Sequence, residues 1–295
     1  PDLILFVFLP TLIFESTYNM EVPRLRQNLA PVMTLAVPGL LLSTAIIGGI
    51  VALVTDLPLT AALLLGAILS ATDPVAVIAL FKQLGAPKRL VVLVEGESLF
   101  NDATSIVLAK ILIGVLAAGA VSAKTVSSGV IDFTVLFFGG VAAGIIMGWI
   151  AGLLLGWVRS DALIEISITT ALAYLSFLVA EEILHVSGVM ATVGAGLTLG
   201  GWGRIKISPP VRAYLEHFWE YMAFIANALI FLLVGMKISL PALWQSLDIL
   251  LVVIAAMTLA RAAVVYGLVP VVGRLPGAEP VSLRFQTVIF WGGLR

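Results

Sequence analysis

The sequence predicts an all-α fold, a polytopic membrane helix bundle, and three observations support this. Of the 295 residues, 61% are hydrophobic and 11% are charged, whereas soluble domains are about 25% charged. The mean hydropathy is +1.14, so the charged residues are too few to cover a soluble surface. Long apolar runs recur along the whole chain, and backbone polar groups in hydrocarbon need the hydrogen bonds of a helix. We expect a single multi-pass domain over 1–295 in the cell membrane, plasma or inner.

Ten apolar runs are candidates for membrane helices, since a helix needs about 20 residues to cross a bilayer. They are 1–17, 32–54, 57–81, 90–118, 131–158, 162–183, 186–200, 217–236, 246–272 and 284–295. The first and last are short because the chain begins and ends inside them. We therefore expect a fragment of a longer protein, truncated at both ends.

The basic residues of the loops predict the orientation of these segments. The loops after the odd-numbered segments contain eleven Lys and Arg, and the alternate loops contain two, Lys124 and Lys237. Cytoplasmic loops accumulate Lys and Arg, so the first set is expected on the cytoplasmic side. The eleven are Arg24, Arg26, Lys82, Lys88, Arg89, Arg159, Arg204, Lys206, Arg212, Arg274 and Arg284.

The composition argues against several classes of function. The net charge of -1, without a basic block, gives no reason to expect a nucleic-acid partner. The chain has no cysteine for a disulfide or a thiolate metal site. Its two histidines, His185 and His217, lack the close spacing of zinc ligands. The sequence shows no nucleophile constellation centred on Ser, Cys or His, so we do not expect an enzyme.

The third segment is interrupted at Thr72-Asp73-Pro74. Pro74 has no N–H and its ring clashes with the carbonyl of Ser70, so the helix must bend or open there. Inside a membrane, an open turn is tolerated only where it lines a cavity or is buried in protein. The freed carbonyls, the Thr72 hydroxyl and the Asp73 carboxylate would then be oxygen ligands in that cavity. The alternative is a proline kink in which Asp73 only caps the second half-helix.

The fourth segment contains Glu97, Ser98, Asn101 and Asp102. A charge at mid-bilayer costs about 3 kcal/mol or more, so each carboxylate suggests a functional site. Ser98 and Asp102 are four residues apart and share a helix face. Asp102 lies about 18 Å along the helix from Leu90, near mid-bilayer. Glu97 lies about 140° around the helix from Asp102. We therefore expect Asp102 to face the cavity and Glu97 to face a structural partner.

Two arginines, Arg261 and Arg295, lie inside the ninth and tenth segments. A guanidinium cannot neutralise itself, so each should meet a carboxylate. Glu97 and Glu15 are the candidates, and helix geometry permits either pairing. The remaining acidic residues near helix ends are expected at the membrane interface; they are Glu165, Glu181, Glu182, Glu220 and Asp248.

Glycine recurs every four residues along the fifth segment and would form a smooth groove for another helix. The residues are Gly140, Gly144, Gly148, Gly152 and Gly156. The groove suits either a subunit interface or packing within the chain.

Several functions remain open for two intramembrane carboxylates. They could form a proton relay without a cation site, or a paired-aspartate protease, although neither Asp73 nor Asp102 lies in a GxGD-type motif. A cation channel would need a filter-like repeat, which does not appear. A transporter of organic anions would need a basic cavity, whereas this one is acidic.

Five motifs together resemble a known family, the monovalent cation:proton antiporters of the sodium/proton exchanger type. They are FLPTLIFESTYNM, SATDPVAV, EGESLFNDATS, LARAAVV and FWGGLR. They resemble, in that order, the third, the broken fifth, the sixth, the eleventh and the broken twelfth helix of that family. The resemblance implies a thirteen-helix homodimeric antiporter with inverted-topology repeats, of which the first two helices and the last are missing here. It implies an ion-translocating core at 57–118 and 246–295, with scaffold or interface helices at 131–236.

The resemblance also implies roles for individual residues. It places the cation where two broken helices cross, the second of them broken at Gly292 and Gly293. The implied ligands are Thr72, Asp73, Ser98 and Asp102, with Glu97 assisting, and Asn101 is also expected among the cation- and proton-binding residues. The implied ion pairs are Glu97 with Arg261 and Glu15 with Arg295.

The resemblance associates the Asn101-Asp102 pair with electroneutral exchange. Asp102 would hold either Na+ (or Li+ or K+) or protons, and competition at one carboxylate would couple the two fluxes. Beyond the bilayer and these transported ions, no cofactor is expected. A K+/H+ exchanger and a channel-like protein remain the alternatives.

Overall fold

The computed structural model describes residues 4–118, 123–158, 161–273 and 279–293. Every regular element in these ranges is a helix, and the described part of each of the ten predicted segments forms helix, interrupted in the third at 71–74. Among the described residues, six helices are long and apolar enough to cross a membrane, and two more are apolar but shorter. The prediction of an all-α membrane bundle is therefore confirmed.

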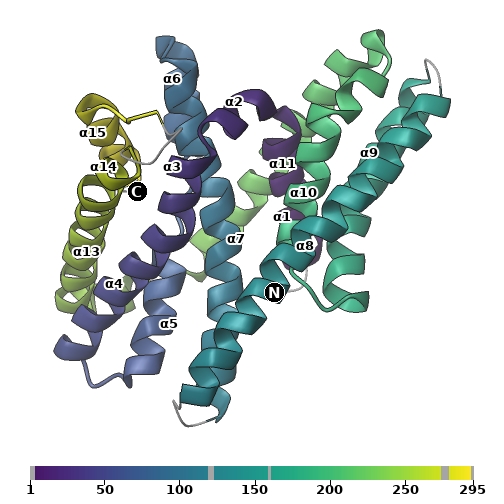
Figure 1. Cartoon of the computed structure of the whole chain (residues 1–295). Coiled ribbons are helices and arrows are strands. Elements are labelled where there is room, and N and C mark those ends of the chain that lie inside the picture. The colour runs from purple at the N-terminus through teal and green to yellow at the C-terminus, as the bar shows by residue number, and fades with distance from the viewer. Residues whose placement is uncertain (1–3, 119–122, 159–160, 274–278, 294–295) are drawn as a thin grey trace. The chain divides into compact units, whose positions relative to one another are not determined.

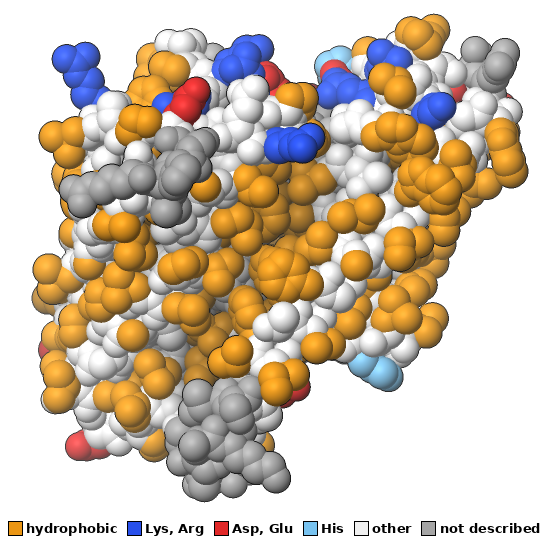
Figure 2. All heavy atoms as spheres, in the orientation of Figure 1, with side chains coloured by type: hydrophobic (Ala, Val, Ile, Leu, Met, Phe, Trp, Pro, Cys, Tyr) orange, Lys and Arg blue, Asp and Glu red, His pale blue; other side chains and the backbone are white. Residues whose placement is uncertain are grey.

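The chain divides into two compact units. Unit 1 comprises Pro1–Pro23 and Thr134–Ser239, and unit 2 comprises Arg24–Phe133 and Leu240–Arg295. The predicted scaffold helices fall in unit 1, and the predicted cation-site residues fall in unit 2. Figure 2 shows hydrophobic side chains along the length of the helices in each unit taken by itself.

Unit 1 has a core of aromatic and aliphatic side chains in which Phe14, Tyr18 and Trp219 are fully buried. Phe14 packs against both rings, with centroids 6.0 Å from Tyr18 and 4.6 Å from Trp219. The elements of this unit are η1 (Ile4–Phe8), α1 (Leu9–Asn19), most of α8 (Ala123–Trp157), α9 (Ala162–Leu178), η3 (Val179–Ile183), α10 (Gly188–Gly201), η4 (Gly203–Lys206) and α11 (Pro209–Lys237).

The glycine groove of α8 holds α10, which belongs to the same unit. A Cβ on Gly140 would lie 2.5 Å from the carbonyl oxygen of Ser187, and one on Gly148 would lie 2.9 Å from that of Ala195. Such distances are shorter than a Cβ can tolerate. The groove is therefore used for packing within the chain, one of the two predicted uses.

Unit 2 carries the interrupted third segment. Its core includes Ile47, Val51, Ala62, Ala256 and Ala260, which come from α4, α5 and α13. Its elements are α2 (Val22–Gln27), α3 (Leu29–Thr34), η2 (Leu35–Gly39), α4 (Leu40–Val54), α5 (Leu59–Ser70), α6 (Val75–Leu84), α7 (Lys88–Ala118), α12 (Leu240–Gln245), α13 (Leu247–Ala262), η5 (Ala263–Leu268), α14 (Val269–Val272) and α15 (Leu283–Gly292). The first residues of α2 precede the boundary between the units.

Two helices begin eight residues before their predicted boundaries: α8 begins at Ala123 rather than at 131, and α11 begins at Pro209 rather than at 217. Ser208 precedes the helix and proline occupies its first positions, an arrangement that suits a helix start because proline lacks the N–H that would be unsatisfied there. Hydropathy missed the first turns of α11 because they carry Arg212 and Glu216. Two short helices, α2 and α12, also form in predicted loops.

Candidate cation site

The third predicted segment consists of two helices separated by a non-helical turn. α5 ends at Ser70 and α6 begins at Val75. Ala71 is extended, with φ -66° and ψ 137°. Because Pro74 cannot donate an N–H to the Ser70 carbonyl, the helical ladder ends at this point. Figure 1 shows α5 and α6 as two separate helices.

Three side chains of α7 donate to backbone carbonyls at the end of α5 and in the turn. Ser105 donates to the Ala67 carbonyl at 2.8 Å, and Asn101 to the Ser70 carbonyl at 3.2 Å. Ser98 donates to the Thr72 carbonyl at 2.5 Å. These donors are spaced three and four residues apart, so they share one face of α7. They replace the backbone donors that the opened helix lacks.

Asn101 has a structural role that the sequence reasoning missed. Its amide nitrogen also lies 3.3 Å from the Thr72 hydroxyl oxygen, so one side chain bonds both sides of Ala71. Asn101 is 3% exposed, and a buried carbonyl without a donor costs about 1–3 kcal/mol. The only signal in the sequence was its spacing from Ser98, which indicates a shared face but not the carbonyl that it meets.

The two aspartates lie at the edge of this arrangement. Asp73 belongs to the turn itself and is exposed, whereas Asp102 follows Asn101 on α7 and is half-buried. Of the four predicted ligands, the structure places Ser98 and Thr72 in direct contact, while Asp73 and Asp102 each follow a residue of this hydrogen-bonded group in the chain.

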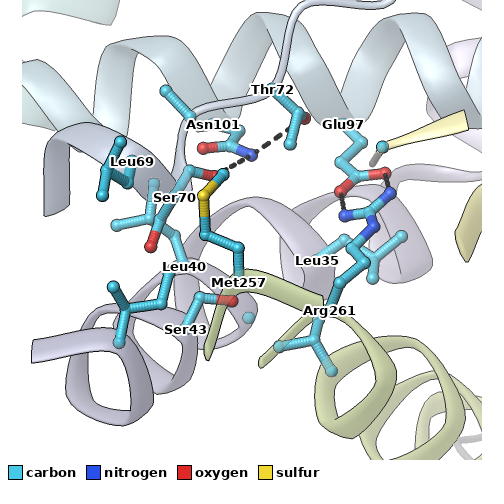
Figure 3. A pocket seen from close by; sticks show the side chains of 15 residues that line it. Leu35, Leu40, Ser43, Leu69, Ser70, Thr72, Glu97, Asn101, Met257 and Arg261 are labelled. Atoms are coloured by element: carbon cyan, nitrogen blue, oxygen red, sulfur yellow. Dashed lines mark hydrogen bonds and ion pairs between the residues drawn. The ribbon is translucent and has the colours of Figure 1, made fainter. Parts of the chain in front are cut away.

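A small pocket lies beside the turn. Its walls include Ser70, Thr72, Asn101, Glu97 and Arg261, and Figure 3 shows the Asn101 amide directed towards Ser70 and Thr72. The Asn101 side-chain oxygen is buried and has no hydrogen-bond partner among the residues that the structure describes. The pocket therefore has an unused oxygen acceptor in addition to the oxygens of the turn.

Glu97 and Arg261 form an ion pair in the wall of this pocket. Arg261 Nη1 pairs with Glu97 Oε1, and Arg261 Nη2 donates to Oε2 at 3.0 Å. Figure 3 shows the two groups face to face. Arg261 Nη2 also donates to the Ile289 carbonyl at 2.8 Å. Glu97 therefore points to a structural partner, while Ser98 and Asn101 on the same helix point to the turn.

The second implied ion pair lies partly outside the described residues, because Arg295 is not among them. Glu15 accepts a hydrogen bond of 3.0 Å from Asn19. The implied second helix break falls at the end of α15, whose last residue is Gly292 and whose C-cap is Gly293.

This arrangement suits a small cation that binds oxygen. Carboxylate, hydroxyl and carbonyl oxygens are hard ligands, and they are the groups that meet at the turn. In secondary transporters, ion sites lie at discontinuous helices whose unwound carbonyls and helix ends face the ion. A polytopic bundle with carboxylates at such an interruption has the features of a secondary transporter.

Comparison with known proteins identifies the family. The family model described as "Sodium/hydrogen exchanger, transmembrane" matches residues 1–295. The chain therefore belongs to the sodium/hydrogen exchanger family, and it is a multi-pass membrane protein of a transporter family.

The chain is similar to several named relatives. It is 40% identical over 297 residues to the Na(+)/H(+) antiporter ApNhaP of Aphanothece halophytica, covering 100% of this chain and 56% of that protein. It is 35% identical over 296 residues to the Na(+)/H(+) antiporter NhaP of Pseudomonas aeruginosa, covering 98% of this chain and 69% of that protein. The chain thus spans little more than half the length of the first relative.

Solved structures support the fold. The sodium proton antiporter MjNhaP1 from Methanocaldococcus jannaschii, solved at pH 8, superposes with a TM-score of 0.77. The sequence identity is 21%, and the match covers 98% of this chain and 70% of that one. At this sequence identity the match shows similarity of fold alone, and the fold of the chain is that of MjNhaP1.

Proposed function

We propose that the chain carries the cation site of a transporter that exchanges Na+ for protons by competition at Asp102. The arrangement at the turn is the main observation behind this proposal. Ser98 and Asn101 hydrogen-bond to the open stretch after Ser70, and Asp102 follows them on α7. The names of the relatives, Na(+)/H(+) antiporters, support the choice of ions.

In this mechanism Na+ and protons share one carboxylate. Na+ binds to deprotonated Asp102 with oxygens of Asp73, Thr72 and Ser98, and a proton displaces it from Asp102. Ser98 and Thr72 can serve because an oxygen that takes part in one hydrogen bond retains a lone pair. Glu97 assists indirectly, since its ion pair keeps the charge of Arg261 engaged. Electroneutral exchange and a homodimer complete the proposal.

The proposal is tested by Asp102→Asn in the full-length protein. Everted vesicles from cells that lack their own exchangers are acidified, and dissipation of the pH gradient is followed after Na+, Li+ or K+ is added. We expect Asp102→Asn to abolish cation-driven proton flux while the protein still folds and reaches the membrane.

Asp132→Asn is the matched control, because it removes the charge of an exposed aspartate on α8. It should leave the flux unchanged. Undiminished flux in Asp102→Asn would refute the assignment. Na+ flux that does not saturate and carries no protons would instead indicate a channel-like protein.

A further inference from the structure

Arg261 joins three helices of unit 2 through its guanidinium. The side chain comes from α13, pairs with Glu97 of α7 and donates to the Ile289 carbonyl of α15. Ile289 lies in the last turn of α15, and its carbonyl also accepts the backbone N–H of Gly293 at 3.1 Å, so Arg261 is a second donor to it. A cation is favoured at this end of a helix because the helix dipole is negative there. Arg261 thus caps α15 and neutralises Glu97 at the same time.

This position of the guanidinium depends on Gly293, the C-cap residue of α15. A Cβ at residue 293 would lie 2.5 Å from Cζ, Nε and Nη2 of Arg261. The backbone there has φ -97° and ψ 0°, a conformation open to any residue. The requirement for glycine is therefore steric and comes from the guanidinium.

The neighbouring glycine makes a useful contrast. A Cβ on Gly292 would approach Val77 no closer than 3.4 Å, which is an ordinary contact. Of these two adjacent glycines, Gly293 is the one at which a charged group, the Arg261 guanidinium, occupies the space that a Cβ would need. The WGG motif therefore has different requirements at its two glycine positions.

Displacing the guanidinium would change the electrostatics of the cation site. Arg261 and Gly293 line the same pocket as Thr72 and Asn101. A side chain at 293 would force Arg261 out of its position and break its bond to Ile289. Glu97 would then neutralise the Arg261 guanidinium less completely. The remaining positive charge beside the turn would repel a bound cation.

We propose that Gly293 is a positioning residue: its missing Cβ allows Arg261 to pack between Glu97 and the end of α15, which keeps the guanidinium charge away from the cation-binding turn. The inference rests on the proposed exchange function. It predicts that Gly293→Ala raises the KM for Na+ about tenfold or more, with a smaller change in maximal rate, because it adds charge repulsion at the site.

The matched control is Gly267→Ala, on η5, six residues after Arg261. A Cβ there meets nothing within 4 Å, so the KM for Na+ should stay at the parent value. Both variants are made in the full-length protein and measured in the vesicle assay, with thermal melting after solubilisation. Equal KM values for Gly293→Ala and Gly267→Ala would overturn the inference.

A double-variant cycle separates this positioning role from general damage to the helix. Arg261→Lys replaces the planar guanidinium by a slimmer ammonium that can still face Glu97. If the Cβ acts through the guanidinium, Gly293→Ala should cost little more in the Arg261→Lys background, in both KM and melting temperature. Additive effects would contradict the proposal.

The cycle also covers two other outcomes. If Gly293→Ala alone does not fold, recovery of folded protein with Arg261→Lys supports the proposal, and no recovery overturns it. If the parent shows no Na+-driven proton flux, the exchange function fails, and the melting cycle still decides whether Gly293 positions Arg261.

Discussion

Each unit contains a buried glutamate, and the two carboxylates have different kinds of partner. Glu97 in unit 2 is 2% exposed and Glu165 in unit 1 is 0% exposed. Glu97 forms its ion pair with Arg261, a second buried charge. Glu165 accepts hydrogen bonds from Ser208, at 3.0 Å from the backbone nitrogen and at 2.6 Å from the hydroxyl.

The comparison shows two solutions to the burial of one charge. Ser208 precedes α11, so Glu165 lies at the positive end of a 29-residue helix. The helix dipole and the two Ser208 donors stabilise the carboxylate there. Glu97 is matched by a full charge that lines the pocket beside the turn. In unit 1, Glu165 therefore links the starts of α9 and α11. In unit 2, the Glu97–Arg261 ion pair lies beside the proposed cation site.

The largest expected effect tests the ion pair. Glu97→Gln leaves Arg261 buried without its counter-charge, and breaking a buried pair in this way costs about 3–5 kcal/mol. We expect a large fall in the melting temperature of the solubilised full-length protein. An unchanged melting temperature would show that the pair does not stabilise the fold.

The second prediction sharpens the comparison by removing both charges. Glu97→Gln combined with Arg261→Gln should recover about 2 kcal/mol of the loss, because no charge is left unpaired. Na+-driven proton flux should stay impaired, since Arg261 no longer caps α15. A double variant as unstable as the sum of the two single variants would argue against coupling between the residues.

A smaller effect is expected in unit 1. Glu165→Gln keeps an oxygen that can accept from the Ser208 N–H, and the Ser208 hydroxyl can turn to accept from the new amide, so the loss should be about 1 kcal/mol. The KM for Na+ should not change. Melting and flux are measured beside Ser208→Ala, which removes the hydroxyl alone. A loss as large as that of Glu97→Gln would contradict the distinction between the two glutamates.

The sequence predicts the local features of this molecule, such as helix positions and breaks, better than it predicts the contacts between distant side chains. The opening before Pro74 follows from the missing N–H of one residue, and apolar length alone locates the ten segments. The start of α11 was missed because Ser208 and its polar first turns lie outside the hydropathy signal. Glu165 lies in the first turn of α9, near a helix end as predicted, but the sequence did not indicate that its side chain is fully buried against Ser208.

The contacts of the site depend on tertiary packing. Helix periodicity placed Ser98 and Asp102 on one face of α7, but it could not show that Ser98 and Asn101 meet the carbonyls of Thr72 and Ser70. It did not decide whether Arg261 pairs with Glu97 or with Glu15. The steric role of Gly293 was also out of reach, because it depends on a side chain 32 residues earlier in the chain.

Proton release on Na+ binding tests most directly whether Asp102 holds Na+ and protons in turn. Solubilised full-length protein in a weakly buffered solution is mixed with Na+, and the pH is recorded. Binding to a protonated carboxylate should release about one proton per chain, and Asp102→Asn should abolish the release while Asp132→Asn preserves it. Saturable Na+ binding without proton release, or undiminished release from Asp102→Asn, would contradict the mechanism.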